Sequence, residues 1–398
     1  MLTSFTAAAN AVVRVQEPSV QILKSSYEFP PLGGGGAKVV MGIARRLAAR
    51  GHRVDVVTMA YRGLSARDVV AGVNVSRIPG MRLRLSTCSF IEMIPYVLIA
   101  PWRIIRMARG GKYRFSHVHF IYPDGVVAWL TKRFTGLPYI ITAHGSDVPG
   151  YNPNRFRLLH VLLKPIWRRI TTDADLIICP SAAIQTLIKA SNPRARTEII
   201  PNGIDLEKFH PQPKVPKRLL VVTRMFERKG VQFVLQALEG LKGEFDLHIV
   251  GDGPYLETLK SLAASLGVRA KFHGYMDNDS AELRNLYETA SLFVFTSESE
   301  NFPIVLLEAM AAGAAIVTTS GTGCAEVVGD AALLVPPRDA AALRTALVKL
   351  SRDPALVERL GHAGRERVVK SFGWERVIEL HLEVYARFAV ATAAKSPP

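Results

Sequence analysis

The chain has 398 residues, 48% of them hydrophobic, so it is longer than the roughly 250 to 300 residues at which a single core stops growing. Its three cysteines, Cys88, Cys179 and Cys324, are far apart, which argues against a disulfide framework or a thiolate zinc site and favours a reducing compartment. The net charge of +16 belongs to one half, because residues 1–200 hold 27 Lys and Arg against 10 Asp and Glu, whereas residues 201–398 carry −1.

The sequence predicts neither a secretory signal at residues 1–19 nor a segment that spans a membrane. Residues 1–19 form a loose, Ala-rich extension, in which Arg14 and Glu17 follow an apolar stretch too short for a secretory signal. The most apolar window, Met93–Trp102, is about half of the roughly 20 residues that cross a bilayer. We therefore expect a cytoplasmic protein.

The first half of the chain predicts a β-α-β unit. An apolar strand at Val20–Leu23 is followed by a glycine-rich turn, a helix over Val39–Arg50 and a second strand over Val54–Thr58. Strands that alternate with helices favour a parallel sheet. Residues 20–200 are therefore expected to form one Rossmann-like domain.

Two loops of this half are candidates for ligand contact. The glycines at 33–36 precede a helix, so their amides could approach phosphate oxygens, although the run has neither a P-loop ending nor the G-x-G-x-x-G register. The strand Tyr139–Thr142 leads into His144, which could hydrogen-bond a sugar or could be satisfied within its own loop.

Two patterns look like metal sites. Asp173-Ala174-Asp175 has the D-x-D form of metal-dependent sugar transferases, but it immediately precedes the strand Leu176–Cys179. His117 and His119 would share one face of a strand and could ligate zinc, but no third ligand is nearby in the sequence. We expect no metal site.

The basic half also carries amphipathic stretches. Residues 154–169 alternate basic with apolar side chains, which is typical of an interfacial helix, and Pro165 is expected to kink it. The apolar stretch Ile91–Met107 could lie beside it. We expect peripheral contact with an anionic membrane, on the inner face of the cell membrane, and no nucleic-acid binding. The alternative is that both segments are core or salt-bridged helices.

The second half repeats the β-α-β pattern, with a strand at Arg218–Thr223, a helix at Val231–Leu241 and a strand at Asp246–Val250. A proline-rich segment precedes it, so the domain boundary is placed after residue 200 and the second domain at 201–373. The final helix, residues 374–390, has an apolar stripe and is expected to pack back on the first domain.

Three motifs of the second half carry charge or allow close approach. Arg224 and Lys229 lie between a strand and a helix, where open α/β sheets bind ligands, and could neutralise a diphosphate. Gly251-Asp252-Gly253 could approach a ligand or be an ordinary turn. Glu300 precedes a helix that Pro303 can open, and Glu308 lies inside it on an apolar run, where it could bind a ribose diol or pair with an arginine.

In their order and spacing these motifs resemble the retaining glycosyltransferases of family 4, over residues 20–388. The pattern includes a GG loop, a helix ending in G-H-x-V, a strand ending in H-G, P-N-G-I-D, R-x-x-x-x-K-G, G-x-G-P, two glutamates eight residues apart and a W-E helix. The resemblance implies the α/β GT-B fold, in which two Rossmann-like doubly wound domains face a central cleft. It also implies a hexosyltransferase that moves a sugar from a nucleotide-sugar donor to a lipid-linked or glycan acceptor bound by the first domain.

The resemblance implies roles for individual residues. Glu308 would hold the ribose, while Arg224 and Lys229 would stabilise the leaving diphosphate, so that no metal or cofactor is required. Glu300 and His144 would contact the donor sugar, and together with Arg224 and Lys229 they form the implied catalytic set. The remaining implied donor contacts are Gly34, Gly35, Gly36, Met276, Asn301 and Phe302.

Two departures from the family pattern leave the donor sugar open. Asn301 and Pro303 stand where the family often has glycines, and Pro303 removes a backbone donor, although the Asn301 amide could contact the sugar instead. Alternatives to a transferase are another GT-B enzyme, namely a sugar-nucleotide epimerase or a phosphorylase, and a noncatalytic protein that binds membranes with its basic face.

Overall fold

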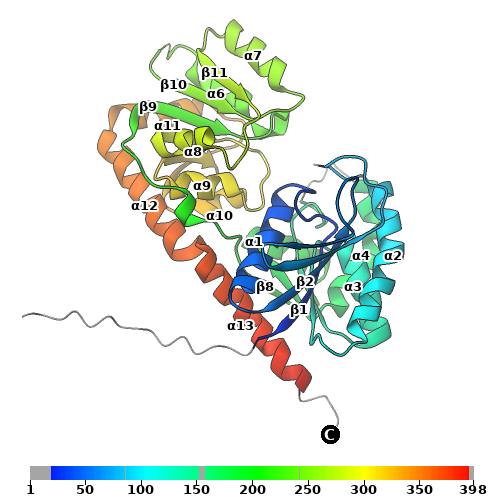
Figure 1. Cartoon of the computed structure of the whole chain (residues 1–398). Coiled ribbons are helices and arrows are strands. Elements are labelled where there is room, and N and C mark those ends of the chain that lie inside the picture. The colour runs from blue at the N-terminus through cyan, green and yellow to red at the C-terminus, as the bar shows by residue number, and fades with distance from the viewer. Residues whose placement is uncertain (1–18, 86, 152–156, 242, 394–398) are drawn as a thin grey trace, which may run out of the picture.

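The computed structural model describes residues 19–85, 87–151, 157–241 and 243–393. In this part of the chain two α/β domains follow one another, each built around one sheet (Figure 1). The arrangement confirms the expected pair of doubly wound domains. The predicted N-terminal extension lies outside the described residues, apart from Ser19.

The sheet of the first domain is parallel except at one edge. Its order in the described residues is β3-β4-β2-β1-β5-β6-β7-β8, and only β3 and β4 pair antiparallel. The strands are β1 (Gln21–Ser25), β2 (Arg53–Met59), β3 (Arg67–Val70), β4 (Val73–Ile78), β5 (Ser116–His119), β6 (Tyr139–Thr142), β7 (Leu176–Cys179) and β8 (Thr197–Ile199).

The helices of this domain differ from the predictions at two points. The first helix begins four residues earlier than expected, so Gly35 and Gly36 form its first turn. Pro165 lies inside one uninterrupted helix, while Arg155 and Phe156 of the same basic stretch lie outside the described residues. The helices are α1 (Gly35–Ala49), α2 (Phe90–Ala108), α3 (Asp124–Thr135), α4 (Arg157–Asp173) and α5 (Ala182–Ser191).

Helix α2 is apolar on two faces. A capping box between Ser89 and Glu92 fixes its N-terminus, an arrangement that typically stabilises a helix by about 1 kcal/mol. One face buries Tyr96 and its neighbours in the core, whereas Ile91 and Trp102 remain 69% and 68% exposed on the other. The stretch is therefore neither a purely interfacial helix nor a purely buried one.

The second sheet is parallel throughout the described residues, in the order β11-β10-β9-β12-β13-β14. Its strands are β9 (Val215–Val222), β10 (Asp246–Val250), β11 (Ala270–Gly274), β12 (Ala290–Phe295), β13 (Ala315–Thr319) and β14 (Ala332–Val335). The domain also contains two short 3-10 helices, η1 (Leu206–Lys208) and η2 (Glu227–Lys229). Its α-helices are α6 (Val231–Leu238), α7 (Leu256–Ser265), α8 (Ala281–Thr289), α9 (Ile304–Ala311), α10 (Gly323–Val328), α11 (Ala340–Arg352) and α12 (Pro354–Phe372).

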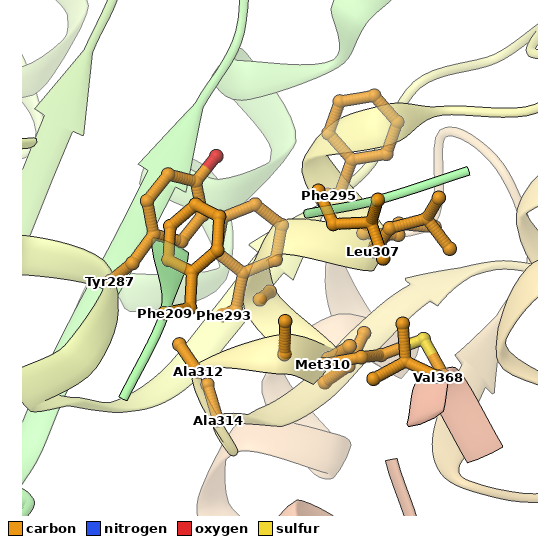
Figure 2. Packing of buried hydrophobic residues seen from close by; sticks show 14 of the residues in the cluster. Phe209, Tyr287, Phe293, Phe295, Leu307, Met310, Ala312, Ala314 and Val368 are labelled. Carbon is orange, nitrogen blue, oxygen red and sulfur yellow. The ribbon is translucent and has the colours of Figure 1, made fainter. Parts of the chain in front are cut away.

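Helix α9 lies in the core on nearly all sides. Leu306, Leu307, Ala309 and Met310 are fully buried, and Figure 2 shows Leu307 and Met310 in the same cluster as aromatic side chains of neighbouring elements. A short helix packed in this way holds its position firmly, because any shift would open cavities. Its one charged residue, Glu308, is thereby fixed in place.

The chain crosses between the domains twice, and the two crossings touch. The Ile204 amide donates to the Phe372 carbonyl at 2.9 Å, and α13 (Trp374–Ala393) then runs from the end of α12 along the first domain (Figure 1). A Cβ on Gly42 or Gly203 would lie 2.3 or 2.4 Å from the Trp374 ring, so both sites require glycine. Val377, Val384 and Tyr385 of α13 join the core of the first domain.

Candidate active site

A cavity of about 460 Å³ lies between the two domains, at the carboxyl ends of both sheets. Loops after β5 and β6 line one wall, and loops after β9 and β12 line the other, which is where ligands of open parallel sheets bind. Of the residues predicted from the sequence, its lining includes Gly34, Gly35, Gly36, His144, Arg224, Glu300, Asn301 and Phe302. Lys229, Met276 and Glu308 lie outside this lining.

Lys229 and Glu300 form a buried ion pair. Lys229 lies in η2, and its Nζ contacts Glu300 Oε1 in the loop between β12 and α9. Their side chains are only 10% and 13% exposed, so the pair is held in a low-dielectric environment where charge interactions are strong. Arg224 at the end of β9 is exposed instead, with its guanidinium 5.6 Å from the Phe226 ring.

The glycine turn after β10 supports the loop that carries Arg224. Gly251 has φ +133°, and a Cβ there would lie 1.7 Å from the Thr223 carbonyl oxygen. The Met225 amide in turn donates to the Asp252 carbonyl at 2.9 Å. The absence of side chains at Gly251 and Gly253 therefore lets this turn pack against the Thr223–Met225 backbone, as in an ordinary structural turn.

Glu308 is partnered by a hydroxyl and not by an arginine. Its Oε2 accepts a hydrogen bond from the Tyr287 hydroxyl of α8 at 2.8 Å, and its side chain is buried. Burial raises the pKa of Glu308, while the Tyr287 hydroxyl and the nearby charges of Lys208 and Lys38 oppose that rise. Asp279, which pairs with Lys208 at 2.7 Å, adds to the rise, so Glu308 lies near charges of both signs, including Lys38 of the first domain.

Asn301 joins the two domains. Its Oδ1 accepts a hydrogen bond at 2.7 Å from the hydroxyl of Ser181, the residue that caps α5 of the first domain. Nearby, Glu326 of α10 accepts hydrogen bonds from the Ala182 and Ala183 amides at the start of the same helix. The Asn301 amide therefore contacts protein through its oxygen, although the residue still lines the cavity.

His144 is held from two directions. Its backbone amide donates to Asp147 Oδ1 at 3.0 Å, and its Nε2 lies 3.2 Å from His119 Nδ1. Which nitrogen donates in this contact depends on the tautomers of the two rings, and the buried His119 Nε2, without a partner in the described structure, favours a proton on His119 Nδ1. In that assignment His144 Nε2 accepts and His144 Nδ1 is a donor.

Burial also keeps His144 uncharged, because it lowers the pKa of this imidazole to about 3. The Nδ1 atom lies on the side of Gly36, whose Cβ would be 3.5 Å from it and 2.6 Å from the Phe120 ring. Phe120 itself has φ +75°, an unfavourable backbone conformation for a residue other than glycine, and its ring also lines the cavity. A neutral donor and the uncapped N-terminus of α1 thus meet in the cavity.

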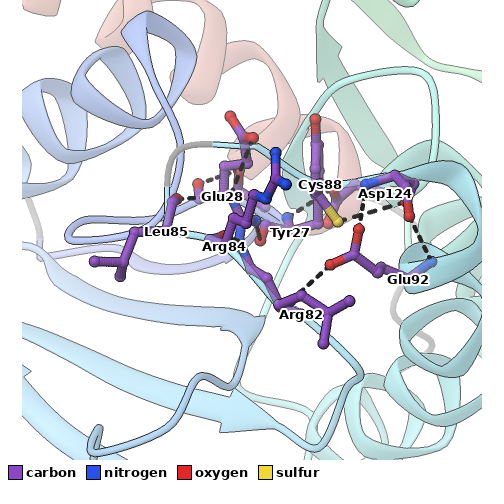
Figure 3. A network of polar contacts seen from close by, with 11 residues as sticks. Tyr27, Glu28, Arg82, Arg84, Leu85, Cys88, Glu92 and Asp124 are labelled. Atoms are coloured by element: carbon purple, nitrogen blue, oxygen red, sulfur yellow. Dashed lines mark hydrogen bonds and ion pairs between the residues drawn. The ribbon is translucent and has the colours of Figure 1, made fainter.

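Two charged residues near the site, Glu28 and Lys38, belong to none of the sequence motifs. Glu28 lines the cavity beside the glycine run, and its carboxylate is paired with the fully buried Arg82 at 3.4 Å (Figure 3). Lys38 is exposed on α1 and acts electrostatically on Glu308 of the other domain. Neither follows a recognisable motif, and their placement depends on tertiary contacts alone.

The two patterns that look like metal sites are engaged in other contacts. Asp175 accepts from Lys132 at 2.7 Å and from the Tyr139 amide, and Asp173 accepts from Trp129, at the junction of α4 and β7. Both ring nitrogens of His117 have hydrogen-bond partners, among them Lys24, whose pKa burial lowers well below its usual value. Among the described residues no three potential ligands gather around one point.

Comparison with known proteins gives two family matches. The model of Glycosyltransferase Family 4 matches residues 33–208, and the model of Glycosyl transferases group 1 matches residues 204–367. The chain is 26% identical to N-acetyl-alpha-D-glucosaminyl L-malate synthase of Bacillus anthracis, over 90% of this chain and 94% of that protein. It is 28% identical to a glycogen synthase of Mycobacterium tuberculosis, over 92% of this chain and 94% of that protein.

Solved structures show the same architecture. Sucrose-phosphate synthase of Thermosynechococcus elongatus superposes with a TM-score of 0.80 at 24% identity, covering 94% of this chain and all of that one. HepE of Anabaena, in complex with UDP and glucose, has a TM-score of 0.73 at 19% identity and covers 92% of this chain and 99% of its own. The likeness confirms the GT-B fold class.

Proposed function

We propose, on the premise that this chain belongs to the group 1 and family 4 glycosyltransferases, that it transfers a sugar from a nucleoside diphosphate donor with retention of configuration and without a metal ion. The observation that supports this most is a cavity lined on one wall by Glu300, which pairs with the buried Lys229 behind it, and on the other by His144. A volume of about 460 Å³ is typical of small-ligand sites. The site combines cations suited to a diphosphate with a carboxylate suited to sugar hydroxyls.

Residues from several elements would share the contacts to the donor. Glu308, with Oε2 held by Tyr287, accepts hydrogen bonds from the ribose hydroxyls. Arg224, Lys229 and the free amides at the start of α1 bind the diphosphate, since helix N-termini attract anions. The sugar then lies between Glu300 and the Nδ1 donor of His144, with Asn301 and Phe302 beside it.

The reaction would need no protein nucleophile. The acceptor oxygen forms a bond to the anomeric carbon on the face that the diphosphate leaves, while the bond from that carbon to the phosphate oxygen breaks. The departing phosphate takes the acceptor proton, so both atoms and electrons balance. The positive charges of Lys229 and Arg224 stabilise the anion that develops during this step.

The first test is a donor screen followed by product analysis. The nucleoside diphosphate that belongs to the true donor should stabilise the protein by roughly 2.7 kcal/mol at 100 times its dissociation constant. With the matching nucleotide sugar, NMR of the product should show the donor's anomeric configuration, and excess EDTA should leave the rate unchanged. Inverted product would overturn the retaining mechanism, and a loss that Mg²⁺ restores would overturn metal independence.

We also propose that the first domain contacts an anionic membrane. None of the described helices is long and apolar enough to span a bilayer, but exposed Ile91, Leu98 and Trp102 lie on α2 near Arg103 and Arg106. Basic side chains near an anionic surface each contribute about 1 kcal/mol, so Arg103→Glu with Arg106→Glu should weaken binding by at least about 30-fold. Flotation with vesicles of phosphatidylcholine and phosphatidylglycerol measures this, and equal flotation without the anionic lipid would contradict it.

A further inference from the structure

An apolar groove of about 200 Å³ opens beside the cleft, between α2, α3 and α4. Val97 and Leu98 of α2 form one wall, and Val126 of α3 and Ile166 of α4 form the other; we call this the α2–α4 groove. Among the lining residues whose side chains the structure describes, the only polar side-chain group is the Tyr122 hydroxyl, which donates to the Leu163 carbonyl at 2.7 Å. The groove therefore offers a ligand no polar partner from these side chains.

The groove continues into the candidate active site. Phe90, Met93, Tyr122 and Leu163 line both the groove and the cleft. Unlike the groove, the cleft is also lined by polar residues, including Glu28 and Ser146. A ligand that filled both spaces would have a polar head and an apolar tail.

The wall formed by α2 is built into the fold. Buried Arg82 donates to the Arg84 and Leu85 carbonyls at 3.0 Å each and so fixes the loop before α2 (Figure 3). The Leu83 amide donates to Glu92 at 2.7 Å, which ties that loop to the first turn of the helix. The groove is thus present before any ligand arrives, which lowers the ordering cost of binding.

We propose that the α2–α4 groove binds the hydrocarbon chain of an amphipathic acceptor whose hydroxyl-bearing head lies in the cleft. The assignment rests on the proposed transferase function and specifies the acceptor class. The outer lip of the groove, at Ile94 and Leu98, adjoins the exposed Ile91 and Trp102 of the same helix. A chain could pass from a bilayer at that face into the groove without crossing a polar surface.

A second copy of this chain fits the groove less well. In a two-fold dimer the same patch meets itself, which would bring Arg103 and Arg106, just after Trp102 on α2, close to their own counterparts. The resulting repulsion between like charges disfavours that contact. The same charges favour an anionic lipid surface.

Binding of n-alkyl β-D-glucosides from butyl to octyl, measured by calorimetry on the full chain, tests the proposal independently of sugar transfer. Each buried methylene should tighten binding by roughly fourfold, so octyl should bind about 200-fold more tightly than butyl. Val97→Trp and Val126→Trp, which fill the groove from opposite walls, should each abolish the dependence on chain length. Ile99→Trp introduces the same indole side chain elsewhere on α2, outside the groove lining, and should retain the dependence.

The outcomes separate the possible occupants. Dependence on chain length that survives both filling variants would place the alkyl chain elsewhere and overturn the proposal. The proposal would also be overturned if binding to the unchanged protein did not depend on chain length and the protein formed a dimer that Leu98→Asp dissociates in analytical ultracentrifugation. If instead alkyl binding follows the prediction but no nucleotide sugar is turned over, the groove stands and the proposed function fails. Thermal unfolding of each variant confirms that it is folded.

Discussion

Glu308→Ala is expected to bind a nucleoside diphosphate at least about 100-fold more weakly than the unchanged protein. The carboxylate is 8% exposed and is held by Tyr287, so it is ordered before the ligand arrives. Hydrogen bonds to a charged group contribute about 1.5 to 3 kcal/mol each, and two ribose hydroxyls would make two of them. The dissociation constant from calorimetric titration, with the nucleoside diphosphate that stabilises the protein most, measures the effect.

A deoxynucleotide shows whether the lost contact is to the ribose. The unchanged protein should prefer the nucleoside diphosphate over its 2′-deoxy form by at least about tenfold, because the missing hydroxyl leaves a buried carboxylate less well satisfied. Glu308→Ala should bind both forms equally. Tyr287→Phe is the matched control, since it removes the partner hydroxyl but leaves the carboxylate in place, and it should keep the preference for ribose.

A general loss of structure would give a different result. If Glu308 served only the core of the second domain, Glu308→Ala would lower the melting temperature while the ratio of the two affinities stayed unchanged. Because Ala removes a buried charge as well as a contact, Glu308→Gln provides a variant of nearly the same shape. A preserved ratio in both variants would remove Glu308 from the donor site.

The sequence predicted best those features that depend on local pattern. Regular alternation of strands and helices predicted both sheets, and strand ends located Arg224 and His144 correctly at the edge where ligands bind. Pro303, as a residue that can open a helix, placed Glu300 in a loop and Glu308 inside the helix, as observed, although the helix begins one residue later, at Ile304. Such features require only that each segment adopts its own preferred structure.

Contacts between distant segments could not be predicted in this way. Ser181 and Asn301 are 120 residues apart, and nothing in either neighbourhood indicates that they meet. The contact between His119 Nδ1 and His144 Nε2 depends on the neighbouring positions of β5 and β6 in the sheet. Gly251 looks like a ligand loop in sequence because a ligand and a neighbouring backbone place the same steric demand on a glycine.

Lys229→Ala is expected to lower kcat by a factor of about 10² to 10³, with a smaller change in donor affinity. Its Nζ lies in a buried pair with Glu300, so its charge is weakly screened, and its attraction for the diphosphate grows as negative charge develops there. An interaction that strengthens in the transition state affects kcat more than KM. Steady-state kinetics with the identified donor and acceptor would show this division.

Arg228→Ala is the matched control, because it removes the same charge one position earlier, from a half-buried residue outside the cavity lining. If the loss of kcat reflected only the net charge of the domain, both variants would be slowed equally. The prediction requires that Arg228→Ala remain within about threefold of the unchanged protein, since Arg228 is more accessible to solvent than Lys229 and lies outside the cavity lining.

A double variant distinguishes direct action of Lys229 from positioning of Glu300. If Lys229 acted only by holding Glu300, then Lys229→Ala combined with Glu300→Gln would be no slower than the more impaired of the two single variants. If Lys229 stabilises the leaving diphosphate while Glu300 binds the sugar, each removes a different contact, and the combined loss should exceed either single loss by at least about tenfold. Because both side chains are largely buried and paired, part of each single effect will be the cost of leaving the other charge alone, and the double variant removes that cost. The comparison thus isolates the contribution that Lys229 makes to the reacting phosphate itself.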